Sequence, residues 1–216
     1  MTDVREIRGI DELRAVEALQ KEVWGCPDLE VLPAIHMTAA REVGAILLGA
    51  FDGEEMVGFV YGFPGFEGEH RVIHSDMLAV RATHRDRGLG RALKLAQREA
   101  ALARGVERIT WTFDPLQTRN AFLNFEKLGV VADRYLRDFY SGATTSPLHV
   151  GGTDRLWVTW HLRERPAFQT STERVAVTTA EETRRAFESA FAAGLIAVGF
   201  DRQRVVYELA VPVSRR

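Results

Sequence analysis

A basic, glycine-containing segment closely follows an apolar run, and its residue types suit the binding of an anion. The run is Met77–Val80 and the segment is His84–Leu93. A strand that leads through such a loop into a helix presents unpaired backbone N–H groups, and the helix dipole adds partial positive charge there. Glycines in the loop remove side chains where a phosphate would touch the backbone. The arginines that can add charge-assisted hydrogen bonds to phosphate oxygens are Arg85, Arg87 and Arg91.

The spacing of the glycines excludes two common phosphate-binding motifs. A Rossmann fingerprint requires a third glycine where Leu93 stands, and a Walker loop requires Lys-Ser/Thr where Arg91-Ala92 follow Gly90. The pattern Arg85-x-x-Gly88-x-Gly90 instead resembles the acetyl-CoA loop of the GNAT superfamily of N-acetyltransferases. The alternative is a solvated arginine-rich turn before an ordinary helix.

The resemblance extends over about residues 1–163. Leu78–Val80 is similar to the end of the family's fourth strand. Asn120–Val130 is similar to a segment further along the family's sequences, which begins with Asn and ends in Tyr-Glu-Lys-x-Gly-Phe. Trp111–Pro115 and Gly62–Gly65 resemble a poorly characterised subgroup called predicted GNAT superfamily acetyltransferases. The ordered set is more specific than any one of these motifs alone.

The resemblance implies that acetyl-CoA is the acyl donor. Backbone N–H groups from Arg87 through Leu89 to Arg91 would hold its pyrophosphate. Leu78 and Val80 would pair their backbone with the pantetheine arm as if it were another strand, and Asn120 would contact the same arm. For Asn120 the alternative is an ordinary helix-surface or capping residue.

Acetyl transfer to an amine also requires a proton acceptor, because alkylammonium groups have pKa values near about 10.4. His74 and Asp76 precede Leu78 at intervals of two, so we expect all three to share one face of a strand. A histidine pKa of about 6.5 suits proton transfer near neutrality. Asp76 would orient His74, bind the ammonium group or act as the base; structural hydrogen bonds at a strand end are the alternative for both residues.

The proton donor for the leaving thiolate is not evident. The family often has a tyrosine where this chain has Phe125, which has no proton to donate. Tyr140 and Tyr135 are the other candidates, and an unassisted thiolate is the remaining one. The same substitution motivates a rival hypothesis, in which the chain binds acyl-CoA as a non-catalytic sensor or interaction module. A nucleotide-phosphate-binding protein is a second rival.

The composition is that of a soluble enzyme. The chain has 216 residues, 27% of them charged, and a net charge of −2, so no overall basic field favours nucleic acid. No apolar run approaches the roughly 18–20 residues that span a membrane, and Met1–Glu6 has no signal-peptide core. Cys26 is the only cysteine, so no intrachain disulfide forms, and we expect a cytoplasmic protein. We expect no metal site, because His70 and His74 lie too far apart on a strand to share a metal ion.

The resemblance implies an α/β (α+β) GNAT fold, with a mixed, largely antiparallel sheet flanked by helices and splayed near residues 80 and 110 to admit the cofactor. After Gly88 we expect a helix whose lysine and arginines, including Lys94, are solvated and whose apolar face contains Leu89, Ala92, Leu93, Ala96, Ala100 and Ala103. The expected strands are 4–10, 45–51, 56–63, 72–80, 106–113, 130–140 and 155–162. We expect a helix after the first strand, with Asp11 as its N-cap.

Two parts are expected in the chain. Residues 1–165 would form the acyl-CoA-binding domain, and the polar break Pro166–Glu173 would begin a small βαββ extension over residues 166–216. Thr179 and Glu182 form a capping box for the helix of this extension. About 50 residues cannot easily sustain their own core, so we expect the extension to pack on the main domain or on a second subunit of a homodimer. The acceptor would be a small-molecule or peptide amine.

Overall fold

The computed structural model describes residues 2–144, 146–149, 151–170 and 173–213, and these divide into two compact units. Unit 1 contains residues 1–109 and 140–152, and unit 2 contains residues 110–139 and 153–216. The break predicted at Pro166–Glu173 includes Ser171 and Thr172, which lie outside the described residues. Both units combine antiparallel strand pairs with helices, as the sequence predicts.

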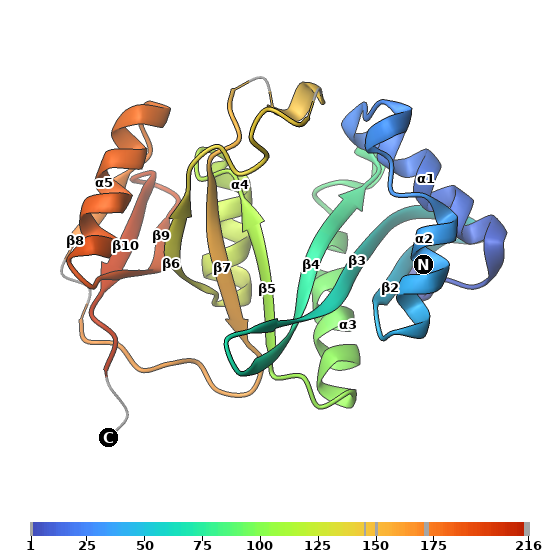
Figure 1. The fold of residues 1–216 in the computed structure, drawn as a ribbon, viewed down its shortest axis with the longest axis horizontal. Coiled ribbons are helices and arrows are strands. Elements are labelled where there is room, and N and C mark those ends of the chain that lie inside the picture. The colour runs from blue at the N-terminus through green and yellow to red at the C-terminus, as the bar shows by residue number, and fades with distance from the viewer. Residues whose placement is uncertain (1, 145, 150, 171–172, 214–216) are drawn as a thin grey trace. The chain divides into compact units, whose positions relative to one another are not determined.

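Unit 1 is a four-stranded sheet with helices on both faces (Figure 1). Its strands lie in the order β1-β2-β3-β4, and each neighbouring pair is antiparallel. Leu13, Val16 and Leu19 of α1 pack with Tyr61 on one face, while α3 covers the other. The elements are β1 (Asp3–Glu6), α1 (Gly9–Trp24), η1 (Asp28–Glu30), α2 (Ala34–Glu42), β2 (Ile46–Asp52), β3 (Glu55–Glu67), β4 (His70–Val80), η2 (Ala82–His84), α3 (Leu89–Ala103) and η4 (Pro147–His149).

Unit 2 is built on the strand order β5-β7-β6-β9-β10-β8. β6 pairs antiparallel with β7 and, at Ala132↔Ala197, with β9, so the C-terminal extension continues the sheet of this unit. The elements are β5 (Arg108–Phe113, of which residues 110–113 belong here), α4 (Thr118–Ala121), the π-helix η3 (Phe122–Leu128), β6 (Val131–Leu136), β7 (Arg155–His161), β8 (Glu173–Ala176), α5 (Ala180–Ala192), β9 (Ile196–Asp201) and β10 (Val206–Ala210).

Most local predictions are confirmed, and the exceptions lie in three places. The Thr179 hydroxyl accepts a hydrogen bond from Glu182 N at 3.2 Å, which is the predicted helix cap. The strand predicted over 4–10 ends at Glu6, and Asp11 is not a cap, because α1 already begins at Gly9. The strand predicted over 130–140 ends at Leu136, because the chain turns there.

The third error concerns the face that α3 buries. Ala103, predicted to be part of the apolar face, is exposed, and the residues that α3 buries are Leu93, Lys94, Gln97 and Ala101. Two of these four are polar.

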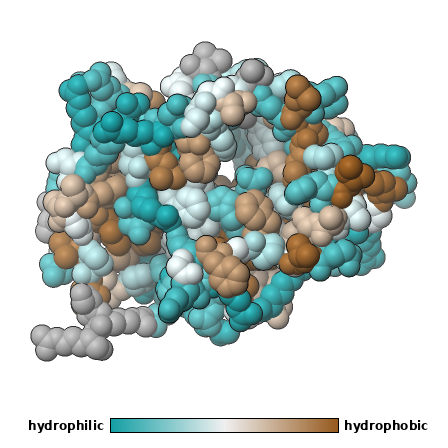
Figure 2. Space-filling view, in the orientation of Figure 1, coloured by the Kyte–Doolittle hydropathy of each residue, from teal (hydrophilic) through white to brown (hydrophobic). Residues whose placement is uncertain are grey.

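The surface that faces the viewer is mixed, with hydrophobic residues scattered among hydrophilic ones (Figure 2).

Candidate active site

The basic loop begins at a rigid anchor at the end of β4. Arg81 N donates a hydrogen bond to Val57 O at 2.8 Å. The Arg81 guanidinium forms ion pairs with Glu22 of α1, at 2.9 Å from Nε, and with Glu55 of β3. Arg81 is only 24% exposed at its side chain, so these partners hold the end of β4 in a defined place. The loop therefore starts from a fixed point.

The loop ends in a helix N-terminus that no side chain caps. Gly88 occupies the N-cap position with φ 79°, a left-handed conformation that favours glycine. The first helical hydrogen bond runs from Ala92 N to Gly88 O at 3.0 Å, so the amides of Leu89 and Gly90 precede the bonded ladder. The first turn of α3 contains no acidic residue. This terminus is electrostatically suited to an anion.

The surroundings of the two glycines fit a phosphate. A Cβ built on Gly88 meets no atom within 4 Å, so the space beside its backbone is open. A Cβ on Gly90 would contact Leu78 Cδ2 at 3.8 Å, which places the first turn of α3 directly over the end of β4. Arg87 and Arg91 are exposed at this end of the helix.

Arg85 lies differently from the other two arginines. Its Nε donates a hydrogen bond to Val80 O at 3.1 Å, so its side chain folds back over the end of β4. The guanidinium keeps further N–H donors beyond this bond. The Val80 carbonyl therefore already accepts a hydrogen bond, although the sequence predicts that the Val80 backbone pairs with the pantetheine arm.

β4 contains a β-bulge at the residues expected to do chemistry. Tyr61 pairs with Met77 and Phe63 pairs with His74, so Ser75 and Asp76 together lie opposite Gly62 of β3. An extra residue on one strand reverses the alternation of side chains beyond it. Val60 pairs with Leu78 and lies three residues from Phe63, which places Leu78 and His74 on opposite faces. The prediction that His74, Asp76 and Leu78 share one face is therefore wrong.

His74 lies on the face that α1 and α2 cover. Its ring packs against Phe63 with the centroids 5.4 Å apart, and Phe63 lies beside Tyr61 at 6.1 Å. Burial and the nearby Lys94 charge lower the pKa of His74 to about 4. His74 is therefore neutral through the neutral range, and the expectation that it titrates near pH 6.5 is wrong.

Asp76 is the titratable neighbour of His74 on the bulge. Solvent reaches its side chain, yet the surrounding protein partly desolvates the carboxylate and raises its pKa. Its negative charge also helps burial to raise the pKa of Tyr61, so the two side chains interact. A carboxylate with a raised pKa is a better proton acceptor than an ordinary aspartate.

Lys94, Ser75 and Gln97 form a buried polar cluster between α3 and β4 that the sequence did not reveal. Lys94 is 3% exposed and its Nζ donates to Ser75 Oγ at 2.6 Å. Desolvation lowers the pKa of Lys94 to about 7. The prediction of a solvated Lys94 is wrong because α3 turns Lys94 toward β4, where Ser75 accepts its hydrogen bond, while Arg91 and Glu99 lie on the exposed side. Sequence offers one weak signal, since Leu93, Gln97 and Ala101 repeat every four residues beside Lys94.

The tyrosine candidates differ in how they are held. Tyr140 lies in the turn after β6, 37% exposed, with its ring edge-on to His149 at 5.1 Å. Tyr135 donates its hydroxyl to Asp154 Oδ2 at 2.8 Å, and burial and this carboxylate raise its pKa. Tyr135 is thus a poorer acid than an ordinary tyrosine.

Two further residues named from the sequence lie in unit 2. Phe125 is buried, with Phe113 and Tyr207 as ring neighbours at 6.4 and 5.6 Å. Asn120 is exposed on α4. Its contact with the pantetheine arm stays a prediction.

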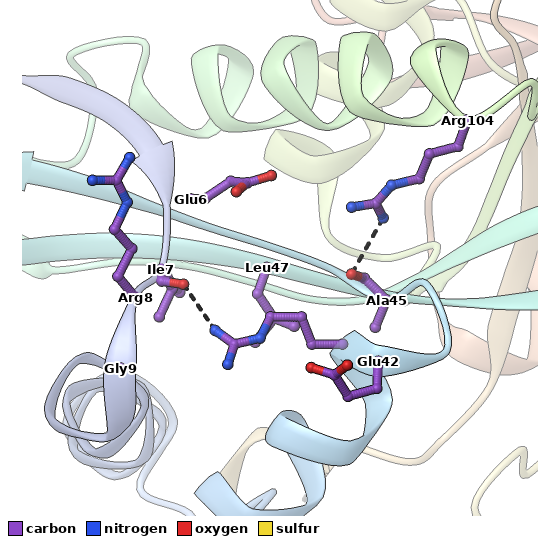
Figure 3. A pocket seen from close by; sticks show the side chains of 9 residues that line it. Glu6, Ile7, Arg8, Gly9, Glu42, Ala45, Leu47 and Arg104 are labelled. Atoms are coloured by element: carbon purple, nitrogen blue, oxygen red, sulfur yellow. Dashed lines mark hydrogen bonds between the residues drawn. The ribbon is translucent and has the colours of Figure 1, made fainter.

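A pocket of about 470 Å³ lies elsewhere in unit 1 (Figure 3). Arg41 donates to Ile7 O at 3.2 Å and Arg104 donates to Gly44 O at 2.8 Å, so two of its cations already satisfy backbone carbonyls. Arg104 follows the last turn of α3, about 24 Å along the helix from Gly88. This pocket is separate from the loop.

Over residues 2–144, 146–149, 151–170 and 173–213, no helix is long and apolar enough to cross a membrane. Within the same residues, no three His, Cys, Asp or Glu side chains gather as metal ligands would.

The sequence profile of the Acetyltransferase (GNAT) family matches residues 10–129, which is more than half of the chain. No curated protein matches the sequence significantly.

Several solved structures share the fold at low sequence identity. The ribosomal-protein-S18-alanine N-acetyltransferase from Escherichia coli is 14% identical, with TM-score 0.54, covering 76% of this chain and 96% of its own. An aminoglycoside 6′-N-acetyltransferase complexed with coenzyme A is 16% identical, with TM-score 0.54 and coverage of 77% and 99%. Ard1 from Thermoplasma volcanium is 14% identical, with TM-score 0.55 and coverage of 76% and 99%.

Proposed function

Because the chain belongs to the acetyltransferase (GNAT) family, we propose that it moves an acetyl group from acetyl-CoA to an amine by direct attack within a ternary complex. The observation that carries this proposal is the uncapped N-terminus of α3 behind Gly88, with open space beside the glycine and exposed arginines around it. Backbone amides and cations of this kind bind a diphosphate. We assign the pyrophosphate of coenzyme A to this terminus.

The end of β4 would guide the reactive arm of the donor. The backbone of Leu78 and Val80 would pair with the pantetheine arm, and N–H groups near Val80 would polarise the thioester carbonyl. Since Val80 O accepts from Arg85 in the structure, Arg85 would either keep this bond or exchange it when the donor arrives. The acceptor would be a small-molecule or peptide amine, handled in the cytoplasm without nucleic acid or membrane, by a monomer or a homodimer.

Removal of the ammonium proton is assigned to Asp76 rather than to His74. Asp76 has a raised pKa and is accessible to solvent, while His74 is held neutral with a pKa of about 4. Asp76 accepts the proton when ionised, so activity declines as the pH falls through its pKa. His74 would position the amine through its neutral imidazole.

Replacing Asp76 tests this division of roles. Asp76→Asn is expected to lower kcat by about 100-fold and His74→Ala by about 10-fold, because general-base catalysis contributes more than positioning at one hydrogen bond. The dissociation constant for acetyl-CoA, measured by isothermal titration, should stay within about twofold in both variants. Glu69→Gln, at the exposed tip of the β3–β4 hairpin, is the matched control. An acid limb of the pH–rate profile that persists in Asp76→Asn would exclude Asp76 as the base.

Two measurements test the function as a whole. Isothermal titration should show binding of acetyl-CoA and CoA, and much weaker binding of ATP and NAD. Thiol release from acetyl-CoA should then exceed the background rate with at least one member of an amine panel that spans small amines, amino acids, aminoglycosides and peptide N-termini. Preference for ATP or NAD would refute the assignment of the loop to coenzyme A.

A non-catalytic acyl-CoA sensor is the second candidate. It is favoured by Phe125, a buried side chain without a proton to donate, in the segment where the family often has a tyrosine. Tight binding of acetyl-CoA without thiol release from any acceptor would select the sensor over the enzyme.

A further inference from the structure

The proposed transfer needs a proton for the departing sulfur, and the buried cluster beneath β4 contains a group suited to give one. A coenzyme A thiol has a pKa near that of cysteine, about 8.5, so protonation assists its departure at neutral pH. Phe125 offers no proton, and Tyr135 is bound to Asp154. Ser75, in contrast, lies within the bulge, one residue before Asp76.

Ser75 and Lys94 are in direct contact away from bulk water. The distance from Lys94 Nζ to Ser75 Oγ is 2.6 Å. Lys94 is 3% exposed and Ser75 is 5% exposed. A lysine ammonium can only donate, so Ser75 Oγ is the acceptor in this bond. The serine hydroxyl therefore keeps its own proton for a different acceptor.

Among the described residues, Lys94 Nζ is the one partner of the Ser75 hydroxyl, and it donates to the oxygen rather than accepting the proton. The side chain of Gln97 lacks hydrogen-bond partners among the described residues. Its side-chain amide is fully buried, and neither its nitrogen nor its oxygen has a hydrogen-bond partner among the described residues. Its Nε2 lies 2.8 Å from the position that a Cβ on Gly62 would take, opposite Ser75 and Asp76. A buried amide without a partner is costly, so Gln97, together with the spare hydroxyl proton of Ser75 beside the same bulge, points to a ligand that completes the site.

Few other charges surround Lys94. On the α3-facing side of the sheet, β3 presents Val60 and Gly62, and β2 presents their partners Leu48 and Ile46, none of which titrates. On β4 the neighbouring titratable groups are His74, whose pKa the lysine charge lowers, and Asp76. Arg91 and Arg98 are the cations one turn away on α3 itself.

We propose that Ser75 and Lys94 together are the proton donor for the coenzyme A thiolate, which deepens the proposed function and rests on it. When the acceptor nitrogen has bonded to the acetyl carbon, the C–S bond breaks and its electron pair passes to sulfur. Ser75 Oγ–H gives its proton to that sulfur, which forms the thiol. Lys94 gives a proton to Ser75 Oγ and becomes a neutral amine, then takes a proton from solvent before the next cycle.

The acidity of the pair matches this task. Burial lowers the pKa of Lys94 to about 7, which makes its ammonium a stronger acid than an exposed lysine and stronger than the thiol it serves. Lys94 must be protonated to act, so kcat should decline as the pH rises through this pKa. Ser75 is a catalytic residue in this scheme, and Lys94 acts through it.

The test uses Ser75→Ala, Ser75→Thr and Lys94→Met in the full chain, with Arg98→Met as the control that removes a cation from the same helix. Thiol release from acetyl-CoA is measured between pH 6 and about 9.5, with the best acceptor from the panel. Ser75→Ala should lose about 100-fold in kcat with little change in the Kd of acetyl-CoA, and Ser75→Thr, which keeps a hydroxyl, should recover most of it. Lys94→Met should lower kcat and remove the alkaline decline, while Arg98→Met should retain it.

Each contrary outcome has a distinct meaning. Two outcomes would refute Ser75 and Lys94 as the proton donor and leave the proposed function intact. The first is wild-type turnover with an unchanged kcat in Ser75→Ala. The second is an alkaline decline of kcat that persists in Lys94→Met. An acetyl group on Ser75, seen by intact-mass spectrometry after incubation with acetyl-CoA alone, refutes this proton donor too, because the pair would then act as a nucleophile. No thiol release by the wild-type protein from any acceptor overturns the proposed function itself.

Discussion

Gly88→Glu is expected to weaken acetyl-CoA binding by at least about 100-fold, equivalent to ~2.7 kcal/mol. The backbone of Gly88 has φ 79°, and the space where its Cβ would stand is open, so the glutamate would project beside the helix N-terminus rather than collide with protein atoms. Its carboxylate would compete with the diphosphate for the same amides and arginines and would repel it. Isothermal titration with acetyl-CoA measures the loss.

The matched control is Gly68→Glu, at the tip of the β3–β4 hairpin. Gly68 also has a positive φ, 58°, and its Cβ would also meet no atom within 4 Å. The two substitutions therefore share the backbone strain of a left-handed non-glycine residue, about 1–2 kcal/mol. If both variants lose the same affinity, the loss reflects strain or misfolding and the loop is not the diphosphate site. Undiminished affinity in Gly88→Glu would likewise refute the assignment.

Lys94→Met is expected to change how the stability of the protein depends on pH. The pKa of Lys94 is about 7 in the folded protein, against an ordinary value near 10.5, so between these values the unfolded chain binds the proton more strongly. The free energy of unfolding therefore rises with pH across this window, and it is lowest at and below pH 7, where folding must bury the charge. From pH 7 to pH 9 the rise from this one group is about 2 kcal/mol.

Urea denaturation at the two pH values measures this effect. The wild-type protein and Arg98→Met should both show the rise, and Lys94→Met should lack about 2 kcal/mol of it, because methionine has no proton to bind. The comparison of slopes avoids a second effect, the loss of the donor to Ser75, which lowers stability equally at both pH values. Equal slopes in all three proteins would mean that Lys94 titrates normally and is not desolvated.

The residues that dictate their own local structure were predictable. Gly88 adopts a left-handed conformation at a helix start and Thr179 caps its helix, as their types and spacing indicate. The uncapped helix start behind Gly88 was predictable in the same way, because its residues lie next to one another along the chain, while its role in cofactor binding stays a prediction.

The chemistry of β4 was only partly predictable. His74 and Asp76 were correctly placed on a strand, but the bulge opposite Gly62 depends on how two strands align, and no local pattern marks it. The bulge moves Leu78 to the face opposite His74. The pKa of about 4 for His74 has the same origin, since burial and a lysine from another element cause it.

The sequence by itself determined most of the elements, the position of the glycine turn before α3 and the family, because each rests on short patterns of named residues. Only the tertiary structure decided that Lys94 is buried against Ser75 and that the Gln97 amide has no partner among the residues that the structure describes. An alanine-rich helix can turn more than one face toward a sheet at similar cost, and long-range packing selects the one that carries Lys94 and Gln97 inward.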